Sequence, residues 1–360
     1  MRGGIVLFAK RPGVTSFSSL FSIKRALGTK KVGHTGTLDS FASGLLVVCT
    51  GSLTRIASYI TSFNKTYDAV IEFGVETDTL EYTGKIVKTA PLPKKDDVLS
   101  AIKQYTGNIL QTPPLFSALH INGERASDIA RSGRVAEMPS RPVTVYASEA
   151  EEFLLEDDRV KAVRVRFSVS KGTYIRSLAR DIGSCCKSAA HLAGLRRLSV
   201  GSFRLEDAAG FSSLAPFTIQ SVYQTISDMQ KAQSASCKAG VSEHTSHSGE
   251  DVQSEVREKM QTMTALLAAE CGFGTAHIFP EYEDDFKHGR PLFSSMFEKG
   301  AGGLCAASVT CSANDVSPGS GTCASGGEGT IAVFGKHGNF LGMISRNGED
   351  AYSYAFVIPD

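Results

Sequence analysis

Alternating apolar and polar positions recur along the first 200 residues and predict strands. The alternating stretches are residues 65–74, 143–153 and 159–170. A period of two is typical of a half-buried antiparallel strand, and an acidic turn between the last two stretches predicts a hairpin. Residues 45–49 are apolar without interruption, which predicts a fully buried strand, and residues 4–9 predict a further short strand.

Apolar residues recur at helical spacing between these strands. The expected helices cover about 16–27, 53–61, 94–105 and 124–132. A further helix is expected to be capped at its start by Gly172-Thr173 and to have an inner face of Ile175, Leu178, Ala179 and Ile182. Thr15 or Ser16 caps the first helix and Gly28 closes it. We expect its apolar face to contain Phe17, Leu20, Phe21 and Leu27. Strands and helices together predict an α+β protein.

The C-terminal half has a different pattern. Residues 231–262 are rich in Ser, Ala, Glu, Lys and Gln, and we interpret them as a low-complexity linker or insertion. Residues 263–360 predict a small β-rich domain, with a hairpin around 331–344 and a helix ending at Gly289. A flexible Gly/Ser-rich insertion is expected to interrupt it at about 300–329. The expected first domain is therefore 1–230.

Length and composition narrow the classes of protein. A chain of 360 residues with 42% hydrophobic and 21% charged residues is typical of two globular domains. No apolar run reaches the ~20 residues of a membrane span, and the apolar run near the start is too short for a signal peptide. The eight cysteines form no CxxC pair, so we expect free thiols and a cytoplasmic protein.

The net charge of +1 hides an asymmetry between the two halves. Residues 1–212 carry 29 Lys and Arg against 20 Asp and Glu, a balance of +9. Residues 213–360 carry 9 against 17, a balance of −8. A basic first half fits a phosphate-rich partner, although ordinary solvated lysines would give the same count.

The most unusual stretch is residues 33–44, Gly-His-Thr-Gly-Thr-Leu-Asp-Ser-Phe-Ala-Ser-Gly. Its acid, Asp39, is the only carboxylate in the first 67 residues. The stretch lacks the GK[ST] ending of a P-loop, the GxSxG of a hydrolase elbow, a second His for zinc and a second acid for glycoside hydrolysis. A lone carboxylate remains, able to act at a sugar anomeric carbon when a cation such as Arg176 keeps it ionised and aligned.

This stretch closely resembles the catalytic motif of the tRNA pseudouridine synthase B (TruB) family. Five further motifs resemble that family in the same order, over about residues 3–212. They are Lys65-Thr66-Tyr67, Thr77-Asp78-Thr79 with Gly84, Pro113 to Ala118, Lys171 to Arg176, and Leu195-Arg196-Arg197. The resemblance implies the pseudouridine synthase fold, an α+β fold with a mixed, largely antiparallel central sheet flanked by helices. Residues 265–360 resemble the PUA-like RNA-binding domain common in that family.

The resemblance also implies roles for particular residues. Asp39 would be the catalytic carboxylate, Arg176 its ion-pair partner and Tyr67 the ring against the target base. His34 would contact RNA and Leu195 would wall the base pocket. Lys10, Lys30, Lys31 and Arg196 are expected phosphate contacts, with solvated charge as the alternative interpretation of the last three.

The implied reaction converts uridine to pseudouridine in the T-arm stem-loop (T-psi-C loop) of tRNA, with the target base flipped out. It needs no redox step, so we expect no cofactor and no metal. We expect a monomer with no protein partner and no membrane association. Asp39 could attack the anomeric carbon or stabilise a cationic or glycal sugar, and the sequence leaves both open.

The chain departs from the family pattern at two places. Ser40-Phe41 replaces a more usual Pro-Leu after the catalytic Asp. Glu81-Tyr82-Thr83 stands where the family usually has an acid two positions before the glycine, and the acid here is Glu81 in place of a shorter Asp. Two structural alternatives also stand, namely Arg176 as a surface residue that pairs with Asp181 and Tyr67 as a plain core residue. The alternative functions are a catalytically inactive RNA-binding or tRNA-folding module and a nucleoside hydrolase.

Overall fold

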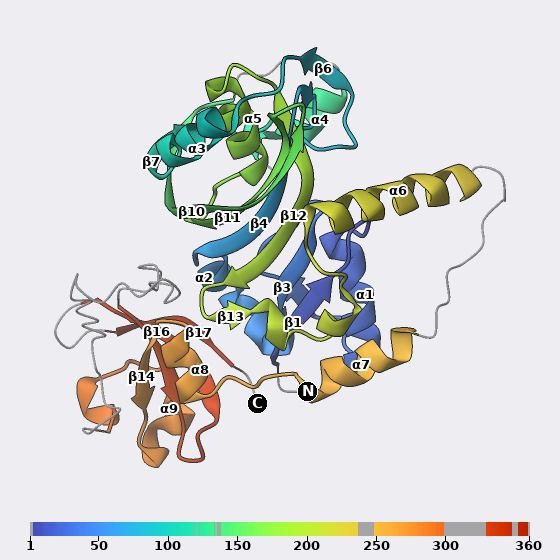
Figure 1. Cartoon of the computed structure of the whole chain (residues 1–360). Coiled ribbons are helices and arrows are strands. Elements are labelled where there is room, and N and C mark those ends of the chain that lie inside the picture. Colours follow the sequence, from blue (N-terminus) through green and yellow to red (C-terminus); the bar gives the residue numbers. More distant parts are fainter. Residues whose placement is uncertain are drawn as a thin grey trace.

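A nine-stranded mixed sheet forms the centre of the protein in the computed structural model (Figure 1). The described residues are 3–117, 119–121, 123–132, 134, 138–236, 248–298, 329–347 and 352–358. The main path of the sheet runs β1 (Ile5–Lys10), β3 (Ser43–Thr50), β12 (Ala190–Val200), β4 (Lys65–Phe73), β11 (Arg159–Val169), β10 (Arg141–Glu156) and β7 (Gly107–Gln111). Two short strands, β2 (Val32–His34) and β13 (Phe203–Arg204), pair with β3 and β12.

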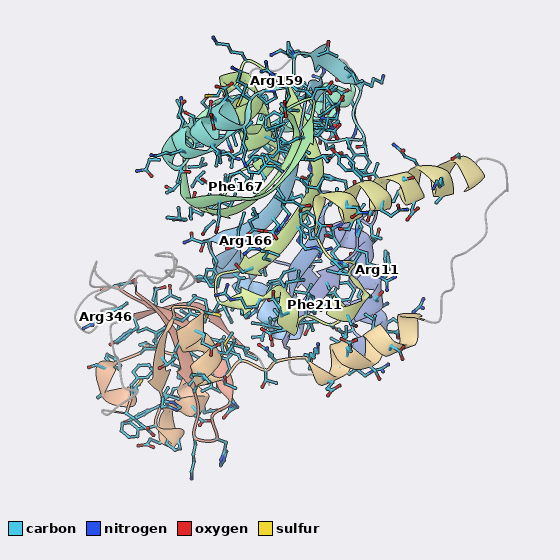
Figure 2. All side chains as sticks on the ribbon, viewed as in Figure 1. Arg11, Arg159, Arg166, Phe167, Phe211 and Arg346 are labelled. Atoms are coloured by element: carbon cyan, nitrogen blue, oxygen red, sulfur yellow. The ribbon has the colours of Figure 1, made fainter. Side chains whose placement is uncertain are left out.

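Most neighbours in this sheet are antiparallel, which confirms the expected α+β class. The pairing of β12 with β3 is parallel and covers only Arg196 opposite Ser43 and Arg197 opposite Gly44. The expected hairpin is formed by β10 and β11, which pair antiparallel from Val145 to Glu156 with three irregularities in register. Figure 2 labels Phe167, a fully buried residue on this part of the sheet.

Helices cover both faces of the sheet. Helices α3 (Lys95–Gln104) and α5 (Ile175–Cys185) pack over β4 and β11 around one apolar cluster. Helices α1 (Ser16–Leu27), α6 (Ile219–Ser236) and α7 (Ser248–Glu258) pack elsewhere on the sheet. The remaining elements of this half are η1 (Gly51–Ile56), α2 (Ala57–Thr61), β5 (Val75–Thr77), β6 (Ile86–Thr89), β8 (His120–Ile121), β9 (Glu124–Arg125), α4 (Ala126–Arg131), η2 (Leu205–Asp207) and η3 (Phe211–Ser213).

Helix α1 has the predicted ends but a different inner face. Thr15 caps it by accepting a hydrogen bond from the Ser18 amide, and Gly28 closes it in the left-handed region. Phe17 and Phe21 were expected inside, but they are 62% and 59% exposed. The buried residues are Ser16, Ser19, Leu20, Ile23, Ala26 and Leu27. Two buried serines displace the predicted stripe because their hydroxyls bond to backbone groups instead of facing water.

The start of α5 also differs from the prediction. The residue at its N-cap is Tyr174, and no side chain caps the helix there, so the expected Gly-Thr cap is wrong. The predicted inner face is correct, because Ile175, Leu178, Ala179 and Ile182 are all buried. The helix therefore begins at Ile175 and carries Arg176 in its first turn.

The C-terminal part forms a separate four-stranded sheet beside the main one (Figure 1). Its strands are β14 (Gly274–His277), β15 (Thr330–Phe334), β16 (Phe340–Arg346) and β17 (Tyr352–Val357). The helical elements nearby are α8 (Ala265–Glu270), η4 (Pro280–Tyr282), α9 (Glu283–Lys287) and η5 (Ser294–Met296). One apolar cluster joins residues of both sheets, including Leu7, Phe273 and Phe334. Arg55 of η1 also donates to the Val357 carbonyl at 2.5 Å.

The described part of residues 231–262 is largely helical. It contains the end of α6 and all of α7, and Val256 of α7 is fully buried against the cluster that contains Leu20 and Ile23. Residues 248–258 therefore pack on the first half of the protein. Nearly all of the expected insertion at about 300–329 lies outside the described residues. The expected domain boundaries remain predictions.

Candidate active site

The stretch that carries Asp39 is a loop held at both ends by the sheet. Gly33 of β2 pairs with Cys49 of β3, and β3 begins at Ser43, directly after the loop. Ser16 of α1 fixes the residue before Asp39, because its hydroxyl accepts from the Leu38 amide at 2.8 Å and donates to the Leu38 carbonyl at 3.0 Å. The backbone on either side of the carboxylate is therefore fixed by neighbouring elements.

Gly44 lets β3 and β12 approach at the end of this loop. Its φ is +112°, a region that residues with a side chain rarely adopt. A Cβ placed there would lie 2.3 Å from the Arg197 carbonyl oxygen and 2.5 Å from the Arg197 nitrogen. Only glycine fits this contact, which joins the loop to the strand that carries Leu195.

Asp39 forms an ion pair with Arg176, as expected. Nη2 of Arg176 donates to Oδ1 of Asp39 at 2.9 Å. The side chain of Arg176 is 6% exposed and that of Asp39 is 34% exposed. The arginine is thus buried, while the carboxylate keeps an open side. The alternative pairing with Asp181 is made by Arg180 instead, at 2.8 Å.

Two backbone carbonyls hold the guanidinium of Arg176 in place. Nη1 donates to the Thr79 carbonyl at 2.9 Å, and Nη2 also donates to the Phe116 carbonyl at 3.0 Å. Nε is buried without a partner among the described residues. Fixed carbonyl acceptors orient the fork so that it meets the carboxylate at one angle. These acceptors belong to two of the family-like motifs, but a backbone carbonyl leaves no side-chain signal in a sequence.

Two buried cations lie behind the loop. Lys10 is 0% exposed, and its Nζ donates to the carbonyls of Val14 at 2.5 Å and Ser40 at 3.2 Å. Arg197 is 2% exposed and donates to the carbonyls of Leu45 at 2.8 Å and Gly36 at 3.0 Å. Burial lowers the pKa of Lys10 to about 8, Asp39 raises it, and Arg197 lowers it.

Lys10 was expected to contact RNA, and that role remains a prediction. In this structure its amine is buried and joins Ser40 to the turn after β1. The sequence suggested a surface role because lysine is almost never fully buried unless its charge is satisfied.

An apolar wall adjoins the ion pair. Tyr67, Leu195, Leu38 and Phe41 belong to one buried cluster and are 9%, 5%, 4% and 5% exposed. Tyr67 comes from β4 and Leu195 from β12, and these two strands pair directly. Leu38 and Phe41, which lie on either side of Asp39 in the loop, therefore share one apolar cluster with Tyr67 and Leu195. Such a site suits a reaction at a carbon centre with a detached intermediate.

Comparison with known proteins agrees with this geometry. Residues 24–175 match the family model described as TruB family pseudouridylate synthase, N-terminal domain. A protein named tRNA pseudouridine synthase B from Treponema denticola is 47% identical over 229 residues, covering 59% of this chain and 64% of that protein. Proteins of the same name from Borreliella burgdorferi and Treponema pallidum are 41% and 36% identical, and the matches cover 78% and 88% of their lengths. The chain belongs to the TruB family.

A solved structure shows the same fold. A chain in the crystal structure of a Cbf5-Nop10-Gar1 complex matches with a TM-score of 0.59 at 22% identity, covering 99% of this chain and 85% of that one. This likeness concerns the fold alone. It supports the expected pseudouridine synthase architecture of a mixed sheet flanked by helices with a further C-terminal sheet.

Within this TruB-family chain, the other expected RNA-contacting residues lie in different settings. Lys30 and Lys31 are exposed just before β2. His34 is partly buried, and its Nδ1 has no partner among the described residues. Burial and, after it, Arg197 lower the pKa of His34, so a neutral imidazole is favoured. The RNA-contacting roles of these three residues remain predictions.

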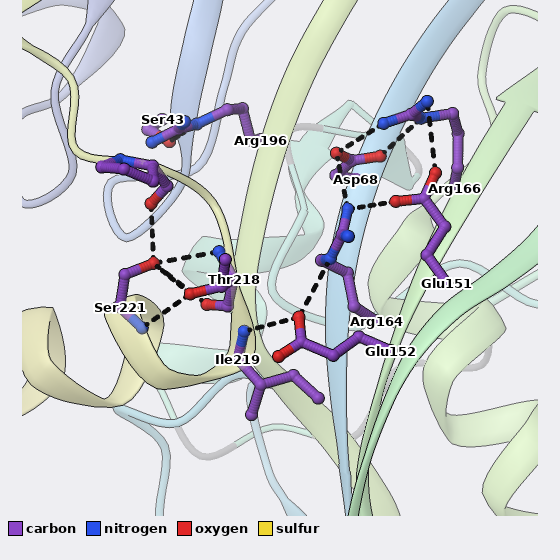
Figure 3. A network of polar contacts seen from close by, with 11 residues as sticks. Ser43, Asp68, Glu151, Glu152, Arg164, Arg166, Arg196, Thr218, Ile219 and Ser221 are labelled. Carbon is purple, nitrogen blue, oxygen red and sulfur yellow. Dashed lines mark hydrogen bonds and ion pairs between the residues drawn. The ribbon is translucent and has the colours of Figure 1, made fainter.

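Arg196 lies on the opposite side of β12 from Leu195. Its Nε donates to Ser43 Oγ at 3.1 Å, and its guanidinium lies 4.9 Å from the centre of the Phe217 ring. Figure 3 shows Arg196 and Ser43 near a network in which Asp68 binds Arg164 and Arg166. Burial lowers the pKa of Arg196 to about 10. A phosphate contact by Arg196 remains a prediction, and its partial burial limits access.

Glu81 was noted only as a departure, but it lies in the electrostatic field of the site. Burial raises the pKa of its carboxyl, Arg176 opposes that rise, and Asp39 adds to it. Its side chain accepts from the Thr83 hydroxyl at 2.8 Å. Arg176 therefore influences two carboxylates while it hydrogen-bonds to only one of them. The described residues contain no group of three or more His, Cys, Asp or Glu that could hold a metal, and no described helix is long and apolar enough to cross a membrane.

Proposed function

We propose that this protein isomerises uridine to pseudouridine in the T-arm of tRNA. The observation that carries the proposal is the Asp39–Arg176 ion pair at 2.9 Å in a chain of the TruB family. Relatives that this chain matches over most of their length are named tRNA pseudouridine synthase B. We expect the enzyme to act as a monomer in the cytoplasm.

The reaction needs one carboxylate and a dry pocket. The bond between the base nitrogen and the anomeric carbon of the ribose breaks, the base turns, and a ring carbon bonds to the same sugar carbon. The proton lost from that ring carbon is balanced by one gained at the nitrogen, so the change is an isomerisation without net redox. Asp39 acts at the anomeric carbon, where it stabilises or attacks the electron-poor sugar.

Arg176 pairs with Asp39 and orients its carboxylate. Because its guanidinium also bonds to the Thr79 and Phe116 carbonyls, the carboxylate cannot rotate away without breaking a hydrogen bond of a buried arginine. Tyr67 and Leu195 bound the space in which the detached base turns, and they keep water from the sugar carbon. The target uridine has to be flipped out of its RNA loop to reach this depth.

RNA binding would come from the basic half and the C-terminal sheet. Lys30 and Lys31 are exposed at the entrance to the Asp39 loop, and exposed lysines bind phosphates as point charges. The sheet of β14–β17 is our candidate for a PUA-like RNA-binding domain. Because this sheet shares an apolar cluster with the main sheet, the two RNA-binding surfaces would stay at a fixed separation.

The test is the conversion of an unmodified tRNA transcript, with pseudouridine scored by chemical probing. Wild-type protein should modify one T-arm uridine, and Asp39→Asn should bind the transcript without modifying it. Equal modification by both proteins would contradict the catalytic assignment of Asp39. Binding without modification by wild type would favour the inactive RNA-binding module, and release of free uracil would favour the hydrolase.

A further inference from the structure

Two aromatic rings join the loop of Asp39 to the loop that holds Arg176. Phe41 follows Asp39 by two residues, and Tyr82 follows Thr79 by three. Their ring centroids lie 6.1 Å apart at an interplanar angle of 79°, an edge-to-face contact. Phe41 is 5% exposed and Tyr82 is partly buried against the same cluster. Both positions belong to the segments where the chain departs from its family pattern.

This contact closes a ring of interactions around the site. Asp39 binds Arg176, and Arg176 binds the Thr79 carbonyl, each at 2.9 Å. The loop of Thr79 then leads to Tyr82, which contacts Phe41 and so returns to the loop of Asp39. Two segments joined at one point can pivot about it, whereas two joined at separate points cannot. The ring pair therefore fixes the angle at which Asp39 meets Arg176.

Tyr82 is itself held from two further sides. Its amide donates to the Leu192 carbonyl of β12 at 3.0 Å, and its hydroxyl lies 3.6 Å from Sδ of Met229 on α6. Leu80, two residues earlier, has a φ of 60° although it is not glycine. A buried leucine in the left-handed region is strained and persists only where the surroundings enforce it. The loop from Thr79 to Tyr82 is therefore held by its contacts and not by its own preference.

The space behind the ring pair is not filled. A cavity of about 270 Å³ is lined by Phe41, Tyr82, Leu195 and Met229, among others. On that side the contact with Tyr82 supports Phe41, which also packs within the buried cluster. Loss of either ring would let the Asp39 loop relax toward the cavity.

We propose that Phe41 and Tyr82 are a pair of positioning residues that brace the Asp39 loop against the loop of Thr79. The inference rests on the proposed function, because it concerns the geometry of that reaction. The pair acts through the backbone, so it controls the rate of the chemical step and not the affinity for RNA.

The experiment is a double-mutant cycle with Phe41→Leu and Tyr82→Ala, measured as the single-turnover rate constant at saturating tRNA. Each single variant should lower the rate constant about tenfold, since misplacing a reacting group has effects of this size or larger. The double variant should be no slower than the worse single variant, because both remove the same brace. The dissociation constant for tRNA should stay within twofold of wild type.

A conservative variant and a matched control separate positioning from general stability. Tyr82→Phe keeps the ring and should restore the wild-type rate constant, and Phe41→Met serves if Phe41→Leu does not fold. Phe203→Leu removes a ring that is 4% exposed and belongs to another cluster. It should lower the melting temperature as Phe41→Leu does, but leave the rate constant unchanged.

The outcomes distinguish this inference from the proposed function. A wild-type protein that forms no pseudouridine overturns the proposed function and the brace with it. An active wild type whose variants keep the full rate constant, or whose two effects multiply independently, overturns the brace alone. A slow Tyr82→Phe variant also overturns it, because the ring contact would then be insufficient.

Discussion

Arg176 shows what a single residue does in this site. It is buried, and its two terminal nitrogens share three acceptors, Asp39 Oδ1 and the carbonyls of Thr79 and Phe116. A lysine there would keep the positive charge but lack the planar fork that reaches all three. The geometry of the donors, and not only the charge, therefore decides how the carboxylate is held.

We expect Arg176→Lys to lower the single-turnover rate constant by roughly 100-fold, because misplacement of a reacting group by about 1 Å costs that much. Arg180→Lys is the matched control on the same helix, since Arg180 binds Asp181 and the Thr112 carbonyl away from Asp39. Rate constants for both variants, with melting temperatures alongside, check the prediction. A wild-type rate for Arg176→Lys would show that charge alone suffices.

The burial of Lys10 predicts how the free energy of unfolding changes with pH. Its pKa falls from 10.5 in an unfolded chain to about 8 in the folded protein, chiefly through burial. Between these pH values the unfolded chain binds more protons at this site, so the Lys10 contribution to the free energy of unfolding rises with pH. Each pKa unit is worth ~1.4 kcal/mol.

Lys10→Met removes that contribution. The difference in unfolding free energy, wild type minus variant, should therefore grow from pH 7 to pH 10 in urea titrations. A comparison with the variant is needed because other groups titrate in the same range, such as Cys49, whose pKa burial raises to about 12. A constant difference across this pH range would mean that Lys10 keeps its ordinary pKa in the folded protein.

At the scale of elements, the close approach of β3 to β12 depends on Gly44. We expect Gly44→Ala to destabilise the protein by about 2–4 kcal/mol, since a methyl group would overlap the Arg197 backbone at a positive φ. Urea unfolding measures the decrease. Gly33→Ala is the matched control, because no atom lies within 4 Å of a Cβ at Gly33. A similar decrease in both variants would mean that the lost stability is a general effect of replacing glycine in these strands and not a result of overlap with Arg197.

The strands and most helices could be predicted from the sequence because their side chains alternate or repeat with a clear period. Residues 65–74 are the simplest case, since Tyr67 and its alternate neighbours all enter one cluster. The buried face of α1 could not be predicted from the sequence. Phe17 and Phe21 lie at helical spacing but are exposed, whereas two serines are buried and form hydrogen bonds. Apolar periodicity cannot detect a hydroxyl that is satisfied by a backbone group.

The candidate site was predictable only in part. Asp39 stands out as a lone carboxylate, but Arg176 lies 137 positions away, and the resemblance to a family was needed to bring the two together. The burial of Lys10 and Arg197 could not be predicted, because charged residues are ordinarily exposed. Their burial depends on carbonyl groups of the loop, which no pattern of side chains reveals.

At the scale of the whole molecule, the uneven charge predicts how tRNA binding responds to salt. Residues 1–212 have a balance of +9 and residues 213–360 a balance of −8, so a polyanion should bind along the first half. We expect the dissociation constant for tRNA to rise at least ~10-fold between 50 and 200 mM salt, because each neutralised phosphate releases counterions. A flat response would contradict binding through phosphate contacts.

Two exposed lysines make this prediction specific. Replacing both Lys30 and Lys31 by Gln should reduce the slope of log Kd against log salt by about two, one for each phosphate that is no longer neutralised. Lys161→Gln is the control, because Lys161 is paired with Glu72 at 3.3 Å and has little charge to offer a phosphate. The rate constant at saturating tRNA should not change in the double variant, since neither lysine belongs to the apolar cluster beside Asp39. If the slope stayed at the wild-type value, the RNA backbone would have to follow a path that avoids the entrance to the Asp39 loop.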